Sequence, residues 1–205
     1  MVSKRADSRT RLLDATIQVV RAKGYAAARV EDVCAEAGVT KGSFFHHFRS
    51  KDDLGLAAAA HWDAHAASVF AGAPHHAPAD PVDRLLAYVD FRKSLLVGDL
   101  TDFTCFAGTV VQETWRTHPE VSAACAGAID AHVATLTEDI REAMAARGVT
   151  GFTPESLARH TQAVIQGAFI LAKADGTAAV AAESLDHLRR YLELLLDKTP
   201  RKDAT

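Results

Sequence analysis

Apolar residues recur every three or four positions in one segment of the chain after another, which is the period of an amphipathic α-helix. Glycine, or a cap residue followed by proline, stands at most of the boundaries between these segments. Alternating runs rich in β-branched and aromatic residues, which would indicate strands, are too short to build a sheet. The pattern therefore predicts an all-α chain with about nine helices, at about residues 7–23, 29–37, 40–48, 51–71, 80–97, 104–116, 119–147, 153–174 and 177–197.

The composition adds limits on where the protein acts. With 48% apolar and 24% charged residues, the 205-residue chain can bury a core. No apolar run reaches the roughly 18 residues that a membrane span needs, and residues 1–10 are polar. Three cysteines are too few for a disulfide scaffold, and their spacing suggests no zinc site. We expect a cytoplasmic protein without a membrane segment, a metal or a cofactor.

The charge is distributed unevenly. Residues 1–51 hold ten Lys and Arg against five acidic residues, whereas the whole chain has a net charge of -3. The excess of positive charge at one end favours an N-terminal segment that meets a polyanion and a larger remainder with another task.

Two short helices at 29–37 and 40–48 flank Gly38 and Val39, the arrangement of a helix-turn-helix. Residues 38–51 read Gly-Val-Thr-Lys-Gly-Ser-Phe-Phe-His-His-Phe-Arg-Ser-Lys and contain no acid. The Thr40 hydroxyl and the free N–H groups of the first turn can bind a phosphate, Lys41 adds a mobile charge, and Gly42 allows close approach of a nucleic-acid backbone. Phe44 and Phe48 would face inward together. This arrangement leaves three side chains to point toward a groove: Phe45, His46 and His47.

This stretch resembles the N-terminal signature of the TetR family of transcriptional repressors over about residues 9–56. The matching residues are Gly24-Tyr25, Val30-Glu-Asp-Val33, Ala37-Gly-Val-Thr-Lys-Gly42, Phe44, His47-Phe48 and Lys51-Asp-Asp-Leu54. The resemblance implies a homodimer whose DNA-binding heads, about residues 1–50, bind a palindromic operator, and whose domain at 51–205 binds a small molecule that releases the DNA.

Carried onto this chain, the resemblance gives a set of DNA-binding positions and two departures. Phe45 stands where the family usually has a tyrosine that meets phosphate, and Ala28 and Arg29 stand where threonine or serine is usual. We therefore expect redistributed phosphate contacts, with Arg29 as a substitute. The expected DNA-binding residues are Arg29, Val39, Thr40, Lys41, Gly42, Phe45, His46, His47 and Lys51.

Aromatic residues gathered within 103–115, with one acid among them, predict an apolar effector pocket with a few polar groups that orient a ligand. An ordinary core with the acid in solvent is the alternative. Cys105 lies near a predicted helix N-terminus, where the dipole favours a thiolate, so sensing of an electrophile or oxidant is a second hypothesis for the signal. The predicted effector residues are Trp62, Phe91, Phe103, Cys105, Phe106, Val110, Glu113 and Trp115.

The last two predicted helices each carry an apolar stripe, which predicts a two-fold four-helix interface between two copies of the chain. The alternative is that the stripes face the core of their own protomer. The predicted interface residues are Leu157, Thr161, Val164, Ala168, Leu171, Leu185, Leu188, Leu192 and Leu195.

Other functional classes find less support in the sequence. His61 and His65 share a helical face, but no third ligand of fixed spacing accompanies them. The sequence lacks a nucleophile elbow, a phosphate-binding glycine loop and the HExxH motif. An enzyme or a protein-binding adaptor without DNA binding remains the alternative class, and it would tolerate the loss of Lys41 and Lys51.

Overall fold

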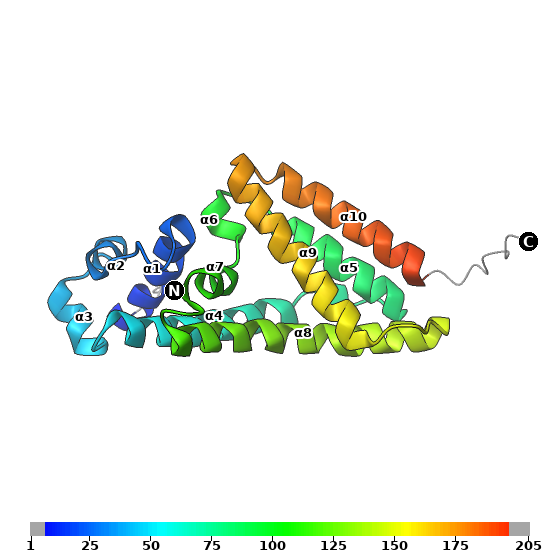
Figure 1. The fold of residues 1–205 in the computed structure, drawn as a ribbon, viewed down its shortest axis with the longest axis horizontal. Coiled ribbons are helices and arrows are strands. Elements are labelled where there is room, and N and C mark those ends of the chain that lie inside the picture. Colours follow the sequence, from blue (N-terminus) through cyan, green and yellow to red (C-terminus); the bar gives the residue numbers. More distant parts are fainter. Residues whose placement is uncertain (1–6, 197–205) are drawn as a thin grey trace, which may run out of the picture. The chain divides into compact units, whose positions relative to one another are not determined.

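The computed structural model describes residues 7–196, and this part of the chain is helical without any strand (Figure 1). The predicted all-α fold is confirmed. No helix in this range is long and apolar enough to cross a membrane. The elements are α1 (Ser8–Lys23), α2 (Val30–Ala37), α3 (Lys41–His47), α4 (Lys51–Ala71), the 3-10 helix η1 (Pro74–His76), α5 (Pro81–Ser94), α6 (Leu100–Phe103), α7 (Phe106–Thr114), α8 (Pro119–Arg147), α9 (Pro154–Asp175) and α10 (Ala179–Leu196).

Packing divides the described chain into two compact units. The first contains the chain up to Ala71 together with Gly98–Asp130, and the second contains Gly72–Val97 together with the chain from Ala131 onward. Helix α8 therefore belongs to both units. The predicted division at residue 50 separated a DNA-binding head from an effector-binding domain, whereas these two units are defined by packing alone.

Short polar side chains begin several helices where the sequence predicted. The Asp7 carboxylate accepts a hydrogen bond from Thr10 N at 2.7 Å at the start of α1. The Asp80 carboxylate likewise accepts from Val82 N at 2.7 Å at the start of α5, with Pro81 in the first turn. Thr153 and a following proline begin α9 in the same way. These caps place the predicted starts of α1, α5 and α9 within a residue or two of the observed ones.

The segment between α5 and α7 differs from the prediction. Helix α5 ends at Ser94 instead of continuing to about residue 97, and a separate turn, α6, precedes α7. That turn is closed locally, because Asp99 N donates to the Asp102 carboxylate at 2.8 Å and the Thr104 hydroxyl donates to Leu100 O at 2.7 Å. A single turn is too short to show a helical period, which explains why the sequence pattern missed it.

The core of the first unit joins the helix-turn-helix to α4, α7 and the first part of α8. Helix α1 packs on α2, α3, α4, α6 and α7. At Gly55 in α4, an added Cβ would lie only 2.8 Å from the Tyr25 hydroxyl oxygen and 3.2 Å from Val121 Cγ1. Glycine therefore lets α4 pass close to Tyr25, in the loop after α1, and to Val121 on α8. The largest fully buried side chains of this core are Leu12, Tyr25, Phe44, Leu54 and Phe106.

In the second unit, α10 packs against α9 and α5, and α5 packs against η1. Ion pairs lie along these contacts. The Lys93 ammonium on α5 is 2.6 Å from the Asp186 carboxylate on α10, and Arg189 Nε on α10 is 3.0 Å from Asp90 on α5. Because these side chains are partly exposed, the pairs contribute little stability.

We expect the stability of the second unit to fall as the pH drops below about 6.5. Burial, with repulsion from Arg92 and His75, lowers the pKa of His132 to about 3, and His132 Nε2 lies 2.8 Å from the Tyr88 hydroxyl. Because the folded pKa is below the unfolded value of about 6.5, the unfolded chain binds the proton first. The free energy of unfolding should then fall by at most about 1.4 kcal/mol per pH unit between pH 6.5 and 3.

Urea unfolding at several pH values, followed by circular dichroism, measures this slope. His132→Asn should flatten it, whereas replacement of an exposed histidine, His65→Asn, should leave it unchanged. An unaltered slope in His132→Asn would assign the pH dependence to other groups.

Candidate nucleic-acid interface

The turn between α2 and α3 positions the second helix. Gly38 adopts the left-handed conformation (φ 60°), which side chains other than glycine rarely take, and its N–H caps α2 by donating to Ala35 O and Cys34 O. Helix α3 is then anchored by Phe44, which is fully buried, and Phe48, whose ring centre lies 5.8 Å from that of Phe44. The anchor fixes which face of α3 points outward.

Helix α3 presents four of the predicted residues on its exposed face. The Thr40 hydroxyl accepts from Ser43 N at 3.2 Å and begins the helix, and an added Cβ at Gly42 would meet only that hydroxyl, at 3.6 Å. The Phe45 side chain is 62% exposed, which is unusual for a phenylalanine, and His46 is exposed as well. The surface therefore combines an open helix N-terminus with an aromatic ring and an imidazole.

The charge of Lys41 is engaged with a neighbouring acid on the surface. The Lys41 ammonium lies 2.5 Å from the Glu31 carboxylate, with both side chains more than half exposed. The hydrogen bond from Lys41 holds the pKa of Glu31 below its ordinary value. Such an exposed pair is weak and exchanges readily for a phosphate, so the pair leaves Lys41 available to an anion.

Three of the predicted DNA contacts are engaged within the protein. The Lys51 ammonium donates to Tyr25 O at 2.5 Å and lies 4.5 Å from the Tyr25 ring centre, so in this structure it holds the loop after α1. His47 Nε2 lies 2.7 Å from the Ser8 hydroxyl on α1. The Val39 side chain is partly buried against the core. The sequence showed these residues in the motif but not their partners.

Two exposed arginines lie in or beside the helix-turn-helix. Arg29 is exposed at the N-cap of α2, where its backbone N–H donates to the Asp32 carboxylate at 2.9 Å. Arg9 on α1 is exposed and its guanidinium carbon lies 5.5 Å from the Phe48 ring centre. Sequence reasoning missed Arg9, because its proximity to α3 depends on the packing of α1 against the motif.

A family model described as "Bacterial regulatory proteins, tetR family" matches residues 12–58, and one described as "Tetracyclin repressor-like, C-terminal domain" matches residues 81–188. The chain belongs to the TetR family. It is therefore a DNA-binding transcriptional regulator, and the alternative of an enzyme is excluded.

Relatives and solved structures agree with this membership. The transcriptional regulator AcuR from Cereibacter sphaeroides is 27% identical over 163 residues, which cover 79% of this chain and 74% of AcuR. The regulator CymR from Pseudomonas putida is 43% identical over 51 residues, a quarter of each chain. A TetR family regulator from Agrobacterium tumefaciens has the same fold, with a TM-score of 0.79 at 23% identity, covering 92% of this chain and 97% of that one.

Four of the eight predicted effector residues lie together in the first unit of this TetR family chain. The Trp62 ring centre lies 6.1 Å from that of Phe106, and Trp62 and Cys105 both pack on the core that contains Phe106 and Val110. Phe103 lies in the same unit and is 8% exposed. Trp62, Cys105, Phe106 and Val110 therefore form one apolar cluster in the core of the first unit.

The remaining predicted effector residues lie elsewhere. The Trp115 side chain is 64% exposed, and Phe91 belongs to the second unit. Glu113 accepts a hydrogen bond from Ala26 N at 2.9 Å and packs against Gly24. Glu113 therefore connects α7 to the loop between α1 and α2. Its hydrogen-bond partner, Ala26, lies 87 positions away in sequence, so no local sequence pattern reveals this contact.

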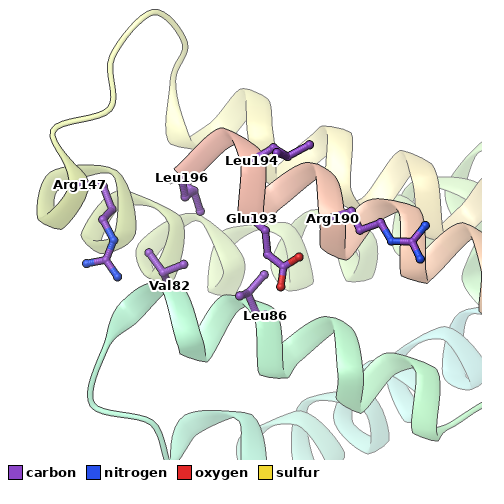
Figure 2. A pocket seen from close by; sticks show the side chains of 7 residues that line it. All are labelled: Val82, Leu86, Arg147, Arg190, Glu193, Leu194 and Leu196. Carbon is purple, nitrogen blue, oxygen red and sulfur yellow. The ribbon is translucent and has the colours of Figure 1, made fainter. Parts of the chain in front are cut away.

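The second unit contains an open groove of about 500 Å³ between α5, α10 and the end of α8 (Figure 2). Apolar side chains form its floor and Leu194 its rim, while Arg147 and Arg190 lie at its two ends. Arg147 is bound to the Asp80 carboxylate at 2.8 Å. None of the predicted effector residues lines this groove.

Most of the predicted dimer residues are buried inside their own protomer, which is the alternative that the sequence left open. The helical period identified the apolar stripes, and these side chains pack in the core formed by α9, α10 and α5. Those buried in this way are Leu157, Thr161, Ala168, Leu185, Leu188 and Leu192, whereas Val164 and Leu195 are partly exposed and Leu171 is 50% exposed.

Proposed function

We propose that the protein is a repressor that binds a palindromic operator as a homodimer and releases it on binding a small apolar or aromatic effector. The DNA-binding part of this proposal is supported by the exposed surface of α3. Its N-terminus, the Phe45 ring and the His46 imidazole are exposed, while Phe44 and Phe48 are buried on its inner side. Regulators of this kind act on chromosomal DNA, so we infer a cytoplasmic location.

In this proposal α3 enters the major groove. Thr40, Lys41 and the Gly42 backbone meet phosphates, while Phe45 and His46 reach base edges, with the phenylalanine ring suited to a thymine methyl group. Arg9, next to Phe48 at the end of α3, and Arg29, at the start of α2, would bind further phosphates. Two such heads in a dimer would bind half-sites about 34–36 Å apart, or a multiple of one helical turn.

We expect Lys41→Ala and Lys51→Ala to have different effects. Loss of the Lys41 phosphate contact should reduce the slope of log affinity against log salt by about one, because one fewer counterion is released. Lys51→Ala should leave the slope unchanged and instead lower the thermal stability, because its ammonium is bound to Tyr25 O and Ala26 O. Fluorescence anisotropy with an operator selected from random DNA, at several salt concentrations, measures both slopes. Equal slopes in Lys41→Ala and the unmodified protein would contradict the assigned role of α3.

The dimer contact is proposed on an exposed apolar face of the second unit. On α9, Ile170 and Leu171 are about half exposed, and Gly167, one turn earlier, has nothing within 4 Å of the position of an added Cβ. On α10, Tyr191 and Leu194 are 42% and 75% exposed. An exposed apolar face of this kind fits a second copy of the chain, and the small residue allows close approach of helices. Leu194 also forms the rim of the groove, which the same partner would cover.

The effector is proposed to bind against the cluster of Trp62, Cys105 and Phe106, and to act by displacing α4, which begins directly after α3. Glu113 would then transmit the movement of α7 to the loop that precedes α2. A screen of metabolites for release of the operator complex would identify ligands. With such a ligand, Trp62→Ala should weaken release more than tenfold, and an unaltered response would move the site elsewhere.

A further inference from the structure

Two glutamines on α9 carry buried polar atoms without hydrogen-bond partners. Within the described residues 7–196, the amide oxygen of Gln162 and the amide nitrogen of Gln166 are shielded from solvent and make no hydrogen bond. Gln162 is 7% exposed, and Gln166 is half-buried. Burial of an amide group without a partner costs free energy, and folded proteins leave few such groups. The two atoms therefore point to a partner from outside the chain.

The two atoms have complementary hydrogen-bonding roles. Residues four positions apart on a helix are neighbours on its surface, so the Gln162 and Gln166 side chains lie beside one another on α9. The unpartnered atom of Gln162 is an acceptor, and that of Gln166 is a donor. Together they match a single chemical group that both donates and accepts a hydrogen bond.

Contacts on either side of Gln162 show which helices it faces. Glu155, Gln162 and Phe169 follow one another at intervals of seven residues, close to two helical turns, so they form one line along α9. At the first position, the Glu155 carboxylate lies 2.8 Å from Arg141 on α8. At the last, the Phe169 ring centre lies 5.7 Å from the guanidinium carbon of Arg92 on α5. Gln162 is midway between them and therefore faces the region of the second unit where α5, α8 and α9 converge (Figure 1).

Polar side chains of α5 and α8 in this part of the second unit bind each other. Tyr88 lies one turn before Arg92 on α5, and its hydroxyl is 2.8 Å from Nε2 of His132 on α8. One turn further back, Arg84 Nε lies 3.2 Å from the Asp139 carboxylate on α8. These contacts join α5 to α8, and neither includes the two glutamine amides.

The chemistry of the glutamine pair restricts the ligand. A carboxylate only accepts hydrogen bonds and would leave the Gln162 oxygen without a donor, whereas an ammonium only donates and would leave the Gln166 nitrogen without an acceptor. A primary carboxamide supplies an N–H and a carbonyl oxygen side by side in one planar group. Phe169, which lies on the same face and is 7% exposed, favours an aromatic body next to the amide.

We propose that Gln162 and Gln166 form a binding site for a neutral aromatic carboxamide. The Gln162 oxygen accepts from the ligand N–H, the Gln166 N–H donates to the ligand carbonyl, and the aromatic ring packs against Phe169. This site belongs to the second unit, whereas the cluster proposed above for the effector belongs to the first. Because the ligand binds the folded chain, it stabilises the folded state in proportion to its occupancy.

The first experiment compares four probes that share a benzene ring and differ in the polar group: benzamide, benzoate, acetophenone and benzyl alcohol. Each is titrated into the full chain in a calorimeter, and thermal unfolding is recorded at saturation. Benzamide should raise the midpoint of unfolding and bind at least about tenfold more tightly than the other three, because it alone offers a donor and an acceptor on two adjacent atoms. A chain that does not bind benzamide, or that binds any other probe equally well, would overturn the proposal.

Methionine substitutions test the two glutamines. Methionine is close to glutamine in length and helix propensity, so Gln162→Met and Gln166→Met should fold. Each should raise the midpoint of unfolding without ligand, because an unpartnered buried atom is removed, and should weaken benzamide binding about tenfold. A lowered midpoint in both variants would show that the amides already have partners, and unchanged benzamide affinity would show that they do not hold the ligand. Either result would overturn the site.

Thr161 provides a matched control on the same helix. Its hydroxyl oxygen is also buried without a hydrogen-bond partner among the described residues, but Thr161 lies about 100° around α9 from Gln162. Thr161→Val should therefore raise the midpoint of unfolding and leave the benzamide affinity unchanged. Loss of benzamide binding in this variant as well would overturn the assignment to the glutamine pair. None of these measurements uses DNA, so a failure of the proposed function would not affect them.

Discussion

Gly167→Arg is expected to turn the protein into a monomer that binds its operator about 10²- to 10⁴-fold more weakly, because the second head of a dimer binds at a high effective concentration that the monomer lacks. Gly167 lies on the exposed face of α9, one turn before Ile170 and Leu171. The Cβ of a side chain there would meet nothing within 4 Å in its own protomer, and arginine is a better helix former than glycine. The fold should therefore be unaffected, while a partner helix would be kept away.

A matched control exists on α8. Gly127 is also a helical glycine with nothing within 4 Å of an added Cβ, and it lies in the first unit. Gly127→Arg adds the same charge and the same helix propensity and should leave sedimentation and operator affinity as they were. If Gly167→Arg sediments as a dimer, the proposed contact face on α9 is wrong. If the unmodified protein is itself a monomer at micromolar concentration, the proposal of a homodimer fails.

Phe44→Ala is expected to destabilise the DNA-binding head by about 3–5 kcal/mol, the cost of removing a fully buried aromatic side chain. Phe44 is fully buried and contacts both Phe45 and Phe48 edge-on or tilted, so its loss leaves a cavity behind α3. Operator binding should be lost at temperatures where the unmodified protein is folded. Thermal unfolding by circular dichroism, together with operator binding at low temperature, measures both effects.

The neighbouring residue provides the contrast. Phe45 is 62% exposed, so Phe45→Ala should change stability by no more than about 0.5 kcal/mol and yet alter the preferred operator sequence. Phe45→Tyr, which supplies the hydroxyl usual at this position, should strengthen binding through a phosphate. A large loss of stability in Phe45→Ala, or none in Phe44→Ala, would contradict the assignment of Phe44 to the buried face of α3 and of Phe45 to the exposed face.

Local features made much of this fold predictable. Asp7, Asp80 and Thr153 begin helices through hydrogen bonds within three residues of themselves, so their signals are complete in the sequence. The outward and inward faces of α3 followed from the four-residue spacing of Phe44 and Phe48. The one-turn helix α6 escaped detection because it is shorter than the pattern used to find helices.

Partners distant in sequence were the part that could not be predicted. An apolar stripe on α10 shows that something covers it, but only the packing shows that α9 and α5 do so within one protomer. The hydrogen bond from Lys51 to Tyr25 O could not be predicted either, because the two residues are 26 positions apart in sequence. Arg21 appeared in the sequence as one basic residue of an N-terminal excess, and its contacts with Thr104 O and the Trp62 ring are visible only in the fold.

The route of α8 has a consequence for how this protein can be dissected. Its 29 residues run without interruption from the first packing unit into the second, and the first unit also requires the residues that follow Gly98. A fragment that ends at Ala71 would lack Phe106 and Val121 and would expose the apolar surface that they cover. No single cleavage can therefore release a complete head. Limited proteolysis should yield either the intact chain or unstable pieces.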